Sequence, residues 1–511
     1  MSRATRAGWE RIRGLPWARF GAGSIAAAAG VALTFVLRAL GLGMFLPELA
    51  VDFAVNVIPG GLESFFIRTM GGGAKALAVL ASLAAVLAAG GLLALPYRRV
   101  QGWLGNRWLV LAAYAAGTAA ATLLLAVPLL GGGIAGAATS AGWGFATFSQ
   151  VLGAILYAAV LDYWLVDVAA HYPEGFHLSR RQFIAAGLGA IAAAGVAFYG
   201  LSAGVVARAR LAFASVEEMF AKERTPTAEF YTVTKNVIDP EVDAGSWRLE
   251  VDGLVAVPRT YGYADLEARS AEEEFVTLEC VSNEVGGDLI GNATWSGIAL
   301  ADLLADVAAD PAADWVALTC ADGYTAGIPL AKALDRRTIV ALRMNGFPLT
   351  RAHGAPARII VPGLYGMFHA KWLTRISLVQ GEFLGFWQRK GWTNRGAIRT
   401  TAIIATPRPD TVVTGPTTIG GVAFAGDRGV SRVEVSTDGG ATWAPATLKA
   451  PALSETAWVL WTFPFDPSEG GAYRVLVRAY DRASVPQEAS AAPPFPDGSA
   501  GYDSITILVS R

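Results

Sequence analysis

The sequence contains little cysteine, little histidine and little charge. Its 511 residues include two cysteines and four histidines, and charged residues make up 16% of the chain. Two cysteines can form one disulfide bridge at most, which excludes a disulfide-stabilised framework. The net charge of −1 and the lack of any basic cluster larger than an arginine pair exclude a general attraction to nucleic acid. The length is enough for about three domains of roughly 150 residues each.

Hydrophobic residues, by contrast, make up 53% of the chain and are concentrated before residue 205. Four windows there are apolar over about 18 or more residues, which is enough for a helix to cross a bilayer. They are 24–46, 74–95, 108–130 and 145–166, and a fifth window, 183–206, begins at Phe183. One such window is equally compatible with a buried core helix, but five in succession predict an all-α transmembrane bundle over residues 1–205.

Arginines predict the orientation of this bundle. They occur at the N-terminus, after the second window and, as Arg180 and Arg181, before the fifth, whereas the loop between the third and fourth windows has no charge. An N-terminus in the cytoplasm fits every one of these loops. Five spans then place the chain beyond residue 206 on the extracytoplasmic side of a cell membrane. Arg38 and Asp162 lie near span ends, where we expect their side chains to reach the membrane interface.

The stretch SRRQFIAAGLGAIAAAG at residues 179–195 resembles a bacterial twin-arginine export signal, here internal and uncleaved. The alternative is that its two arginines only set the orientation. Because the twin-arginine route carries folded proteins, the resemblance implies that the exported domain binds a prosthetic group. All four histidines, His171, His177, His353 and His369, lie outside the apolar windows. We therefore do not expect a haem held between paired histidines in the bundle.

The rest of the chain divides into three parts. Residues 206–228 predict a charged helical linker. In residues 229–400, strand patterns such as SWRLEVDGLV and DWVALTCADGY alternate with the helix-spaced SGIALADLLADVAAD, which indicates an α+β domain. Beyond residue 401 the helical spacing ends, and RVEVSTDGGATWAP predicts a hairpin. Residues 401–511 therefore predict an immunoglobulin-like β-sandwich with a structural role, in packing or in dimerisation.

Cys280 lies in FVTLECVSNEVGG, at the edge between an apolar strand and a loop that contains glycine. A side chain at such an edge is held rigidly and still faces a cavity. A deprotonated thiolate suits a soft metal centre, whereas burial as a small apolar residue is the commoner fate of a free cysteine. We assign that second role to Cys320, inside VALTC. A disulfide between the two cysteines is a further alternative outside the cytoplasm, and it would remove the metal ligand.

Four stretches of the second half together resemble the molybdopterin domain of the sulfite oxidase family. In chain order they are LECVSNEVGG, ATWSGIALADLL, DGYTAGIPL and HGAPARIIVPGLYGMFHAKWLTRISL. The following VSRVEVSTDGGATW is similar to the C-terminal dimerisation domain of that family. The resemblance covers residues 228–511 and leaves the apolar half uncovered. It implies an oxidoreductase with a molybdopterin cofactor and a homodimer formed through the C-terminal domain.

The resemblance also implies roles for particular residues. Cys280 would ligate the molybdenum, and Tyr324 in DGYTAGIPL would be the active-site tyrosine, able to donate a hydrogen bond or to relay a proton. The implied contacts to the pterin and its phosphate tail come from Asn236, Asn283, His353, Arg358 and Lys371. Arginine and lysine suit phosphate oxygens, and for His353 a purely structural role is the alternative.

The sequence departs from the family where sulfite-oxidising members place substrate-binding arginines. Glu284 and Val285 follow Asn283, and Lys235 precedes Asn236. A glutamate beside the metal repels the sulfite dianion, by roughly several kcal/mol at short range in a protein-like dielectric. A neutral or cationic substrate, such as a sulfoxide, fits better. The sequence has no CxxCH haem-attachment motif, so we expect no haem and a separate electron-transfer partner, a cytochrome or a quinone-linked protein.

These observations predict a multi-pass membrane oxidoreductase that transfers an oxygen atom to or from a small molecule at the extracytoplasmic face. Two alternatives remain open. One is a sulfite oxidase-type enzyme, and the other is a membrane-tethered binding or scaffold protein that has lost catalysis and purifies without molybdenum. A transporter is disfavoured because the spans contain few charges.

Overall fold

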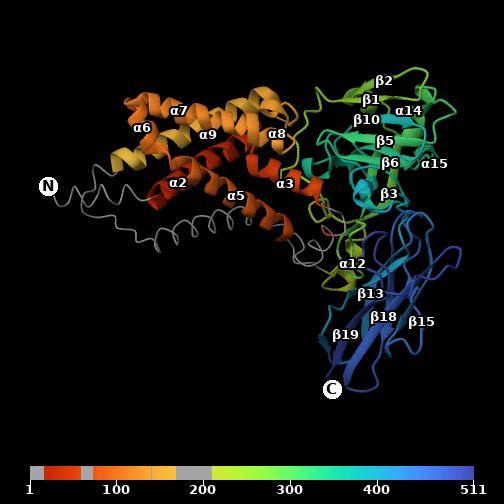
Figure 1. The fold of residues 1–511 in the computed structure, drawn as a ribbon. Coiled ribbons are helices and arrows are strands. Elements are labelled where there is room, and N and C mark those ends of the chain that lie inside the picture. The colour runs from red at the N-terminus through yellow and green to blue at the C-terminus, as the bar shows by residue number, and fades with distance from the viewer. Residues whose placement is uncertain are drawn as a thin grey trace. The chain divides into compact units, whose positions relative to one another are not determined.

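The computed structural model describes residues 16–58, 62, 73–139, 141–168, 210–236 and 238–510. The chain forms two compact units, both drawn in Figure 1. The N-terminal unit comprises Met1–Ile58, Phe66–Ala207 and Lys235–Ile238. The C-terminal unit comprises Pro59–Phe65, Arg208–Thr234 and Asp239–Arg511.

The described part of the N-terminal unit is mostly helical (Figure 1). Its helices are α2 (Pro16–Ala39), α3 (Leu46–Val57), α5 (Gly73–Ala94), α6 (Tyr97–Leu104), α7 (Arg107–Ala121), α8 (Val127–Leu129) and α9 (Gly142–Asp162). Helix α2 packs along both α5 and α9, and α7 packs on α9. Glycines allow these helices to approach closely. A Cβ on Gly23 would lie 2.4 Å from the carbonyl oxygen of Gly90, and a Cβ on Gly30 would lie 2.8 Å from that of Gly153.

Four helices of the described chain are long and apolar enough to cross a membrane by length and composition. They are Ala18–Ala39, Leu77–Leu104, Arg107–Leu129 and Gly142–Val166. The first differs from the predicted window 24–46, because α2 ends at Ala39 and the chain turns at Gly41, whose φ is +75°, before α3 begins. A hydropathy window does not register a turn between two apolar segments. The predicted fifth span, the twin-arginine stretch, His171 and His177 lie outside the described residues.

The expectation that Arg38 and Asp162 reach the membrane interface is wrong for Asp162. Its side chain is buried, accepts a hydrogen bond from the Tyr97 hydroxyl at 2.5 Å and pairs with Arg107 at 2.6 Å. Arg38 pairs with Glu48 at 2.8 Å. The corner between α6 and α7 brings Tyr97 and Arg107 to the end of α9, and a sequence window contains no sign of that tertiary contact.

The predicted helical linker is largely wrong. Between residues 210 and 236 the described chain has one helix, α12 (Val216–Ala221). Ser215 caps it by accepting a hydrogen bond from the backbone N–H of Glu218 at 3.2 Å. Pro226 follows shortly afterwards, and a proline disfavours helical conformation in the residue before it. The charged sequence therefore forms a short helix followed by irregular chain.

Residues 248–379 contain two sheets and short helices, which confirms the predicted α+β character. The first sheet has the order β2-β1-β10-β5-β6, formed by Arg259–Gly262, Arg248–Gly253, Leu373–Val379, Trp315–Cys320 and Thr325–Pro329. The second has the order β3-β4-β7-β8, formed by Glu272–Glu279, Ile290–Ala299, Ile339–Met344 and Phe347–Pro348, and β9 (Arg358–Ile360) pairs with β7. The predicted helix begins at Leu300 as α14 (Leu300–Asp306), and its leucines are buried.

Residues 401–510 contain no helix and form two sheets, as predicted. One has the order β11-β13-β17-β16, formed by Thr401–Thr406, Thr417–Phe424, Val459–Phe465 and Thr447–Leu448. The other has the order β12-β19-β18-β14-β15, formed by Thr411–Val413, Asp503–Val509, Gly471–Asp481, Val430–Ser436 and Ala444–Pro445. Side chains of both sheets, among them Ile404, Trp461, Val433 and Ile505, share one hydrophobic core. The predicted hairpin is the antiparallel pair β14–β15.

The α+β and β-rich parts of the C-terminal unit are joined by packing and by backbone hydrogen bonds. Ile359 and Val361 belong to the same core cluster as Phe424 and Leu460. On β3, the backbone N–H of Thr277 donates to the carbonyl of Thr456 at 2.9 Å. The strand that leads to Cys280 is thus hydrogen-bonded to the β-rich part.

Candidate active site

Cys280 follows the last residue of β3, as the sequence predicts for a strand-to-loop edge. Its backbone N–H donates to the carbonyl of Leu289 at 2.9 Å, and its Sγ lies 3.1 Å from Ser282 Oγ. The side chain is 8% exposed, and burial raises the pKa of the thiol. A thiolate at this position therefore needs a positive partner, such as a metal ion, to replace the proton. Both Cys280 and Cys320 are free, so they do not form the alternative disulfide.

The loop after Cys280 is braced by Glu279 and Asn283. The Asn283 carboxamide donates to Glu279 Oε1 at 3.1 Å and accepts from the Leu289 backbone N–H at 3.0 Å. Glu279 is 5% exposed, and burial raises the pKa of its carboxyl group to about 7. Asn283, expected from the resemblance to contact the cofactor, thus uses both ends of its carboxamide to fix the loop. Glu279 did not emerge from the sequence, although it directly precedes the cysteine.

Two tyrosines have a phenol whose pKa is raised by burial and further by the charge of Cys280. The Tyr324 hydroxyl donates to the carbonyl of Met367 at 2.6 Å. Burial raises its pKa, and Cys320 and Cys280 raise it further. Tyr231, which the sequence analysis did not select, also has a pKa that burial and then Cys280 raise, while Arg358 lowers it. The only signal for Tyr231 in the sequence is its place in FYTVTKN, five residues before Asn236.

Arg358 begins β9 and is the buried cation of this region, with 5% of its surface exposed. Its guanidinium donates to the carbonyls of His353 at 3.2 Å and His369 at 3.0 Å, and lies 4.9 Å from the ring of Trp295. Among the described residues no carboxylate pairs with it, and its Nε has no partner. Burial lowers the pKa of Arg358 to about 10. A buried charge without a counter-ion is costly, so this position suits an anionic ligand.

His353 and Lys371 lie beside this cation. The His353 Nε2 lies 3.0 Å from the carbonyl of Thr227, and burial followed by the charge of Arg358 lowers the pKa of His353 to about 4. The ring is therefore neutral at pH 7. Lys371 Nζ donates to the carbonyl of Ala352 at 3.0 Å and lies 4.4 Å from the ring of Trp372. The structure thus brings together the stretch HGAPAR, which contains His353 and Arg358, and the stretch HAKW, which contains Lys371.

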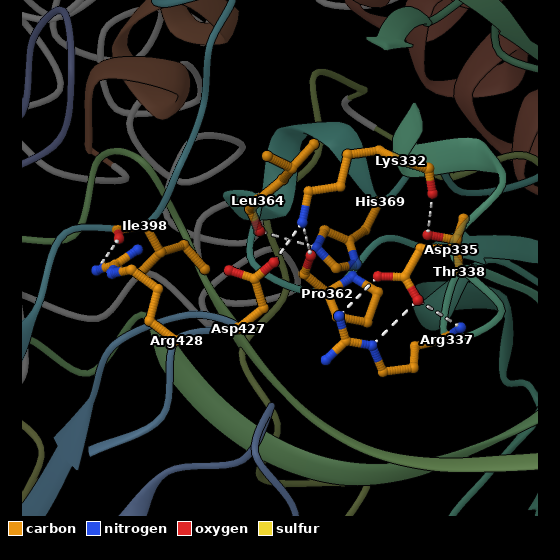
Figure 2. A network of polar contacts seen from close by, with 10 residues as sticks. All are labelled: Lys332, Asp335, Arg337, Thr338, Pro362, Leu364, His369, Ile398, Asp427 and Arg428. Carbon is orange, nitrogen blue, oxygen red and sulfur yellow. Dashed lines mark hydrogen bonds and ion pairs between the residues drawn. The ribbon is translucent and has the colours of Figure 1, made fainter. Parts of the chain in front are cut away.

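His369 supports the turn that follows β9. Its Nδ1 accepts from the Val361 backbone N–H at 3.2 Å, so its Nε2 carries the proton and donates to the carbonyl of Leu364 at 3.0 Å. Figure 2 shows His369 next to Lys332, which donates to the carbonyl of Pro362 at 3.0 Å and pairs with Asp427 at 2.5 Å. Because Asp427 belongs to the β-rich part, this ion pair ties that part to the turn.

Asn236 keeps its role as a cofactor contact as a prediction. With Lys235, whose Nζ donates to Asn236 Oδ1 at 3.1 Å, it belongs to the N-terminal unit. The C-terminal unit therefore assembles Cys280, Asn283, Tyr324, His353, Arg358 and Lys371, and it adds Glu279, Tyr231 and His369.

The same part of the chain matches two known protein families. The family described as "Oxidoreductase molybdopterin binding domain" matches residues 236–387, and the one described as "Mo-co oxidoreductase dimerisation domain" matches residues 395–492. The curated relatives include mitochondrial sulfite oxidase of Mus musculus, 31% identical over 318 residues, and sulfite oxidase of Gallus gallus, 30% identical over 319 residues. Each alignment covers 53% of this chain, and it covers 58% of the mouse protein and 69% of the chicken protein.

A solved structure shares the fold of this part. The crystal structure of the sulfane dehydrogenase SoxCD from Paracoccus pantotrophus aligns with a TM-score of 0.50 and 23% identity. The alignment covers 56% of this chain and 84% of that one. The chain belongs to the sulfite oxidase family of molybdopterin-binding oxidoreductases. It spans little more than half of the mouse relative's length.

Proposed function

We propose that this chain is a membrane-anchored oxidoreductase that holds a molybdenum–pterin cofactor in its C-terminal unit. It transfers an oxygen atom to or from a small neutral substrate at the extracytoplasmic face. The observation that carries this proposal is the buried guanidinium of Arg358, which no carboxylate of the described chain neutralises, in the same unit as the buried thiol of Cys280.

The residues present fit the cofactor at its phosphate tail and at its metal. The unpartnered Nε of Arg358 and the adjacent Lys371 ammonium offer charge and N–H donors to the phosphate tail of a pterin. His353 accepts a hydrogen bond from Arg358 through its backbone carbonyl, and its ring, neutral at pH 7, adds no third positive charge. A phosphate bound there would neutralise a cation that the fold otherwise buries alone.

Cys280 fits the metal. Its loop is fixed by hydrogen bonds to Leu289 and through Asn283, which hold the backbone that carries the sulfur, and a thiolate is a ligand for soft metals. When bound, the molybdenum cofactor supplies two-electron redox chemistry coupled to oxygen-atom transfer. Tyr324 donates its phenolic proton to the Met367 carbonyl, and it would instead donate a hydrogen bond to a ligand bound beside Cys280.

The charges of the loop after Cys280 favour a neutral substrate. Glu284 and Asp288 are both partly exposed there, and Arg210, the arginine that lies against Gly286 of this loop, is paired with Asp503. At an effective dielectric of roughly 20, one carboxylate repels a unit negative charge at 4 Å by about 4 kcal/mol. A sulfoxide or an amine N-oxide carries no net charge and avoids this cost. Sulfite oxidation remains the second candidate, because the mouse and chicken relatives are sulfite oxidases.

The setting in the membrane is part of the same proposal. Four apolar helices of suitable length support anchoring, and the arginine distribution supports a cytoplasmic N-terminus. Export of the folded, loaded unit would use the twin-arginine stretch. The match of residues 395–492 to a dimerisation domain supports a homodimer. Electrons would come from a separate membrane partner, a cytochrome or a quinone-linked protein.

Membrane preparations test this function. The full-length protein is extracted in detergent and analysed for molybdenum and pterin, and it is then assayed with sulfoxides and N-oxides plus a reduced dye, and with sulfite plus an oxidised dye. We expect about one molybdenum per chain and turnover of the neutral oxygen donors. Turnover of sulfite alone contradicts the substrate proposal, and a protein that purifies without molybdenum contradicts the enzyme proposal.

A further inference from the structure

Tyr231 has a hydroxyl that is not engaged within the described chain. Its ring stacks on Phe230 with the centroids 5.4 Å apart, and no hydrogen bond joins its hydroxyl to another described residue. The hydroxyl of Tyr324, in contrast, donates to the carbonyl of Met367 at 2.6 Å. The Tyr324 hydroxyl is therefore hydrogen-bonded within the described chain, and the Tyr231 hydroxyl is not.

Gly366 locates the Tyr231 hydroxyl. A Cβ on Gly366 would lie 2.7 Å from Tyr231 Oη, 3.3 Å from the carbonyl oxygen of Glu279 and 3.8 Å from the Cα of Cys280. The hydroxyl and the backbone of the cysteine thus meet at this one glycine. Gly366 does not have a positive φ, so its backbone conformation is open to alanine, and the space taken by the hydroxyl is what excludes a side chain.

The charges around Tyr231 agree with this position. Gly366 places the hydroxyl beside the backbone of Cys280, and the pKa of the phenol is raised by burial and then by Cys280 and is lowered by Arg358. Burial keeps the phenol protonated at neutral pH, which leaves it a hydrogen-bond donor. A neutral donor suits the oxygen atom of a neutral substrate, because it gains a hydrogen bond without requiring a counter-charge.

We propose that Tyr231 is a substrate-binding residue, whose hydroxyl donates a hydrogen bond to the oxygen atom of a sulfoxide or N-oxide bound beside Cys280. This inference rests on the proposed function and names one of its specificity determinants. Sulfite-binding sites of the family use arginines for an anion, whereas here an uncharged phenol takes the oxygen of an uncharged molecule. Tyr231 binds and orients the substrate and does not exchange its own proton.

The first test removes the hydroxyl alone. Tyr231→Phe is expected to lower kcat/KM for a sulfoxide by about 10- to 100-fold, with the molybdenum content unchanged. Binding of dimethyl sulfone, a neutral S=O compound, is expected to weaken about tenfold when measured by calorimetry. Tyr473→Phe is the matched control, because its hydroxyl bonds to the Glu469 carbonyl in the β-rich part, and it should leave both values unchanged.

The second test addresses the geometry without catalysis. Gly366→Ala should lower the melting temperature by about 2–8 °C in the wild-type background, because its methyl group meets the hydroxyl. In the Tyr231→Phe background the same substitution should cost much less, since the nearest remaining atoms lie at 3.3 Å or beyond. If Gly366→Ala lowers the melting temperature equally in both backgrounds, the position assigned to the hydroxyl is wrong.

The outcomes separate the inference from the proposed function. If the wild-type protein turns over sulfoxides and Tyr231→Phe does so equally well, with sulfone binding unchanged, the inference is wrong and the proposed function stands. If the wild-type protein turns over only sulfite, the proposed substrate class is wrong and the inference falls with it. Loss of sulfoxide turnover and of sulfone binding in Tyr231→Phe, with molybdenum retained, supports both.

Discussion

Arg358 donates a hydrogen bond to the backbone carbonyl of His369 at 3.0 Å, and among the described residues no carboxylate faces its buried charge. A carbonyl satisfies an N–H group, but it does not neutralise a cation. The fold therefore holds a positive charge whose counter-ion the described chain does not supply. The proposed function assigns the phosphate of the cofactor as this counter-ion.

The first prediction concerns this charge. Arg358→Met should reduce the molybdenum and pterin content at least tenfold, because the anion loses its buried partner. The cofactor-free variant should be as stable as the cofactor-free wild type, or more stable by about 1–3 kcal/mol, because a buried unpaired charge is removed. Metal analysis and urea unfolding measure the two effects. Arg343→Met, an exposed arginine paired with Glu267, is the control and should retain the cofactor. Equal molybdenum in both variants would contradict the assignment.

The second prediction compares the two cysteines. Cys280→Ala should abolish turnover while the protein stays folded, because the thiolate ligand is lost and the removed side chain is small. Cys320 is also buried, at 3% exposure, but it ends β5 and pairs with Leu373 in the sheet. Cys320→Ala should retain molybdenum and cost roughly 1 kcal/mol of stability. Turnover by Cys280→Ala at the wild-type rate would refute the ligand role.

The third prediction concerns pH. The pKa of His353 is about 4 in the folded protein, against 6.5 for an ordinary histidine. Below pH 6.5 the unfolded chain binds a proton that the folded chain does not, so stability falls as the pH drops from 6.5 toward 4 and is fully present above 6.5. Between pH 7 and pH 5, the free energy of unfolding should therefore fall by about 2 kcal/mol less in His353→Gln than in the wild type. Urea unfolding of the cofactor-free proteins at the two pH values measures the difference, and equal losses would contradict it.

The fourth prediction concerns the ion pair in Figure 2 that joins the two parts of the C-terminal unit. Lys332 and Asp427 are each about one quarter exposed, so their interaction is screened only in part. A double-mutant cycle with Lys332→Met and Asp427→Asn should give a coupling energy of about 1 kcal/mol. The more exposed pair of Arg343 and Glu267 should give about 0.5 kcal/mol or less. A coupling in the first pair no larger than in the second would show that the pair does not join the two parts.

The sequence predicted the elements whose patterns are local. The apolar run before Cys280 predicted the strand that ends at Glu279, and the leucine spacing predicted the helix that begins at Leu300. The charged composition of residues 206–228 led to a wrong prediction, because charge and helix propensity do not fix the ends of a helix, and α12 spans only Val216–Ala221. The first apolar window was displaced because two helices with a turn between them form one apolar stretch.

The candidate site was predictable only where motif residues carry it. Arg358 and Lys371 were found through HGAPAR and HAKW, but the lack of a counter-ion for Arg358 is visible only once its neighbours are known. Tyr231 and Glu279 were missed because no motif marks them, and their significance comes from their contacts with Gly366 and Asn283 in the folded chain. Tyr231 lies far from Gly366 in sequence and meets it only in the fold.

X-ray absorption at the molybdenum edge tests the central claim most directly. The fully assembled protein, extracted from membranes, is compared with the Cys280→Ser variant. If the Cys280 thiolate holds the molybdenum, a variant that still contains the metal should have one molybdenum–sulfur bond fewer than the wild type. A variant that contains no metal agrees with the same assignment. Identical sulfur shells in the two proteins, at equal metal content, would contradict the account.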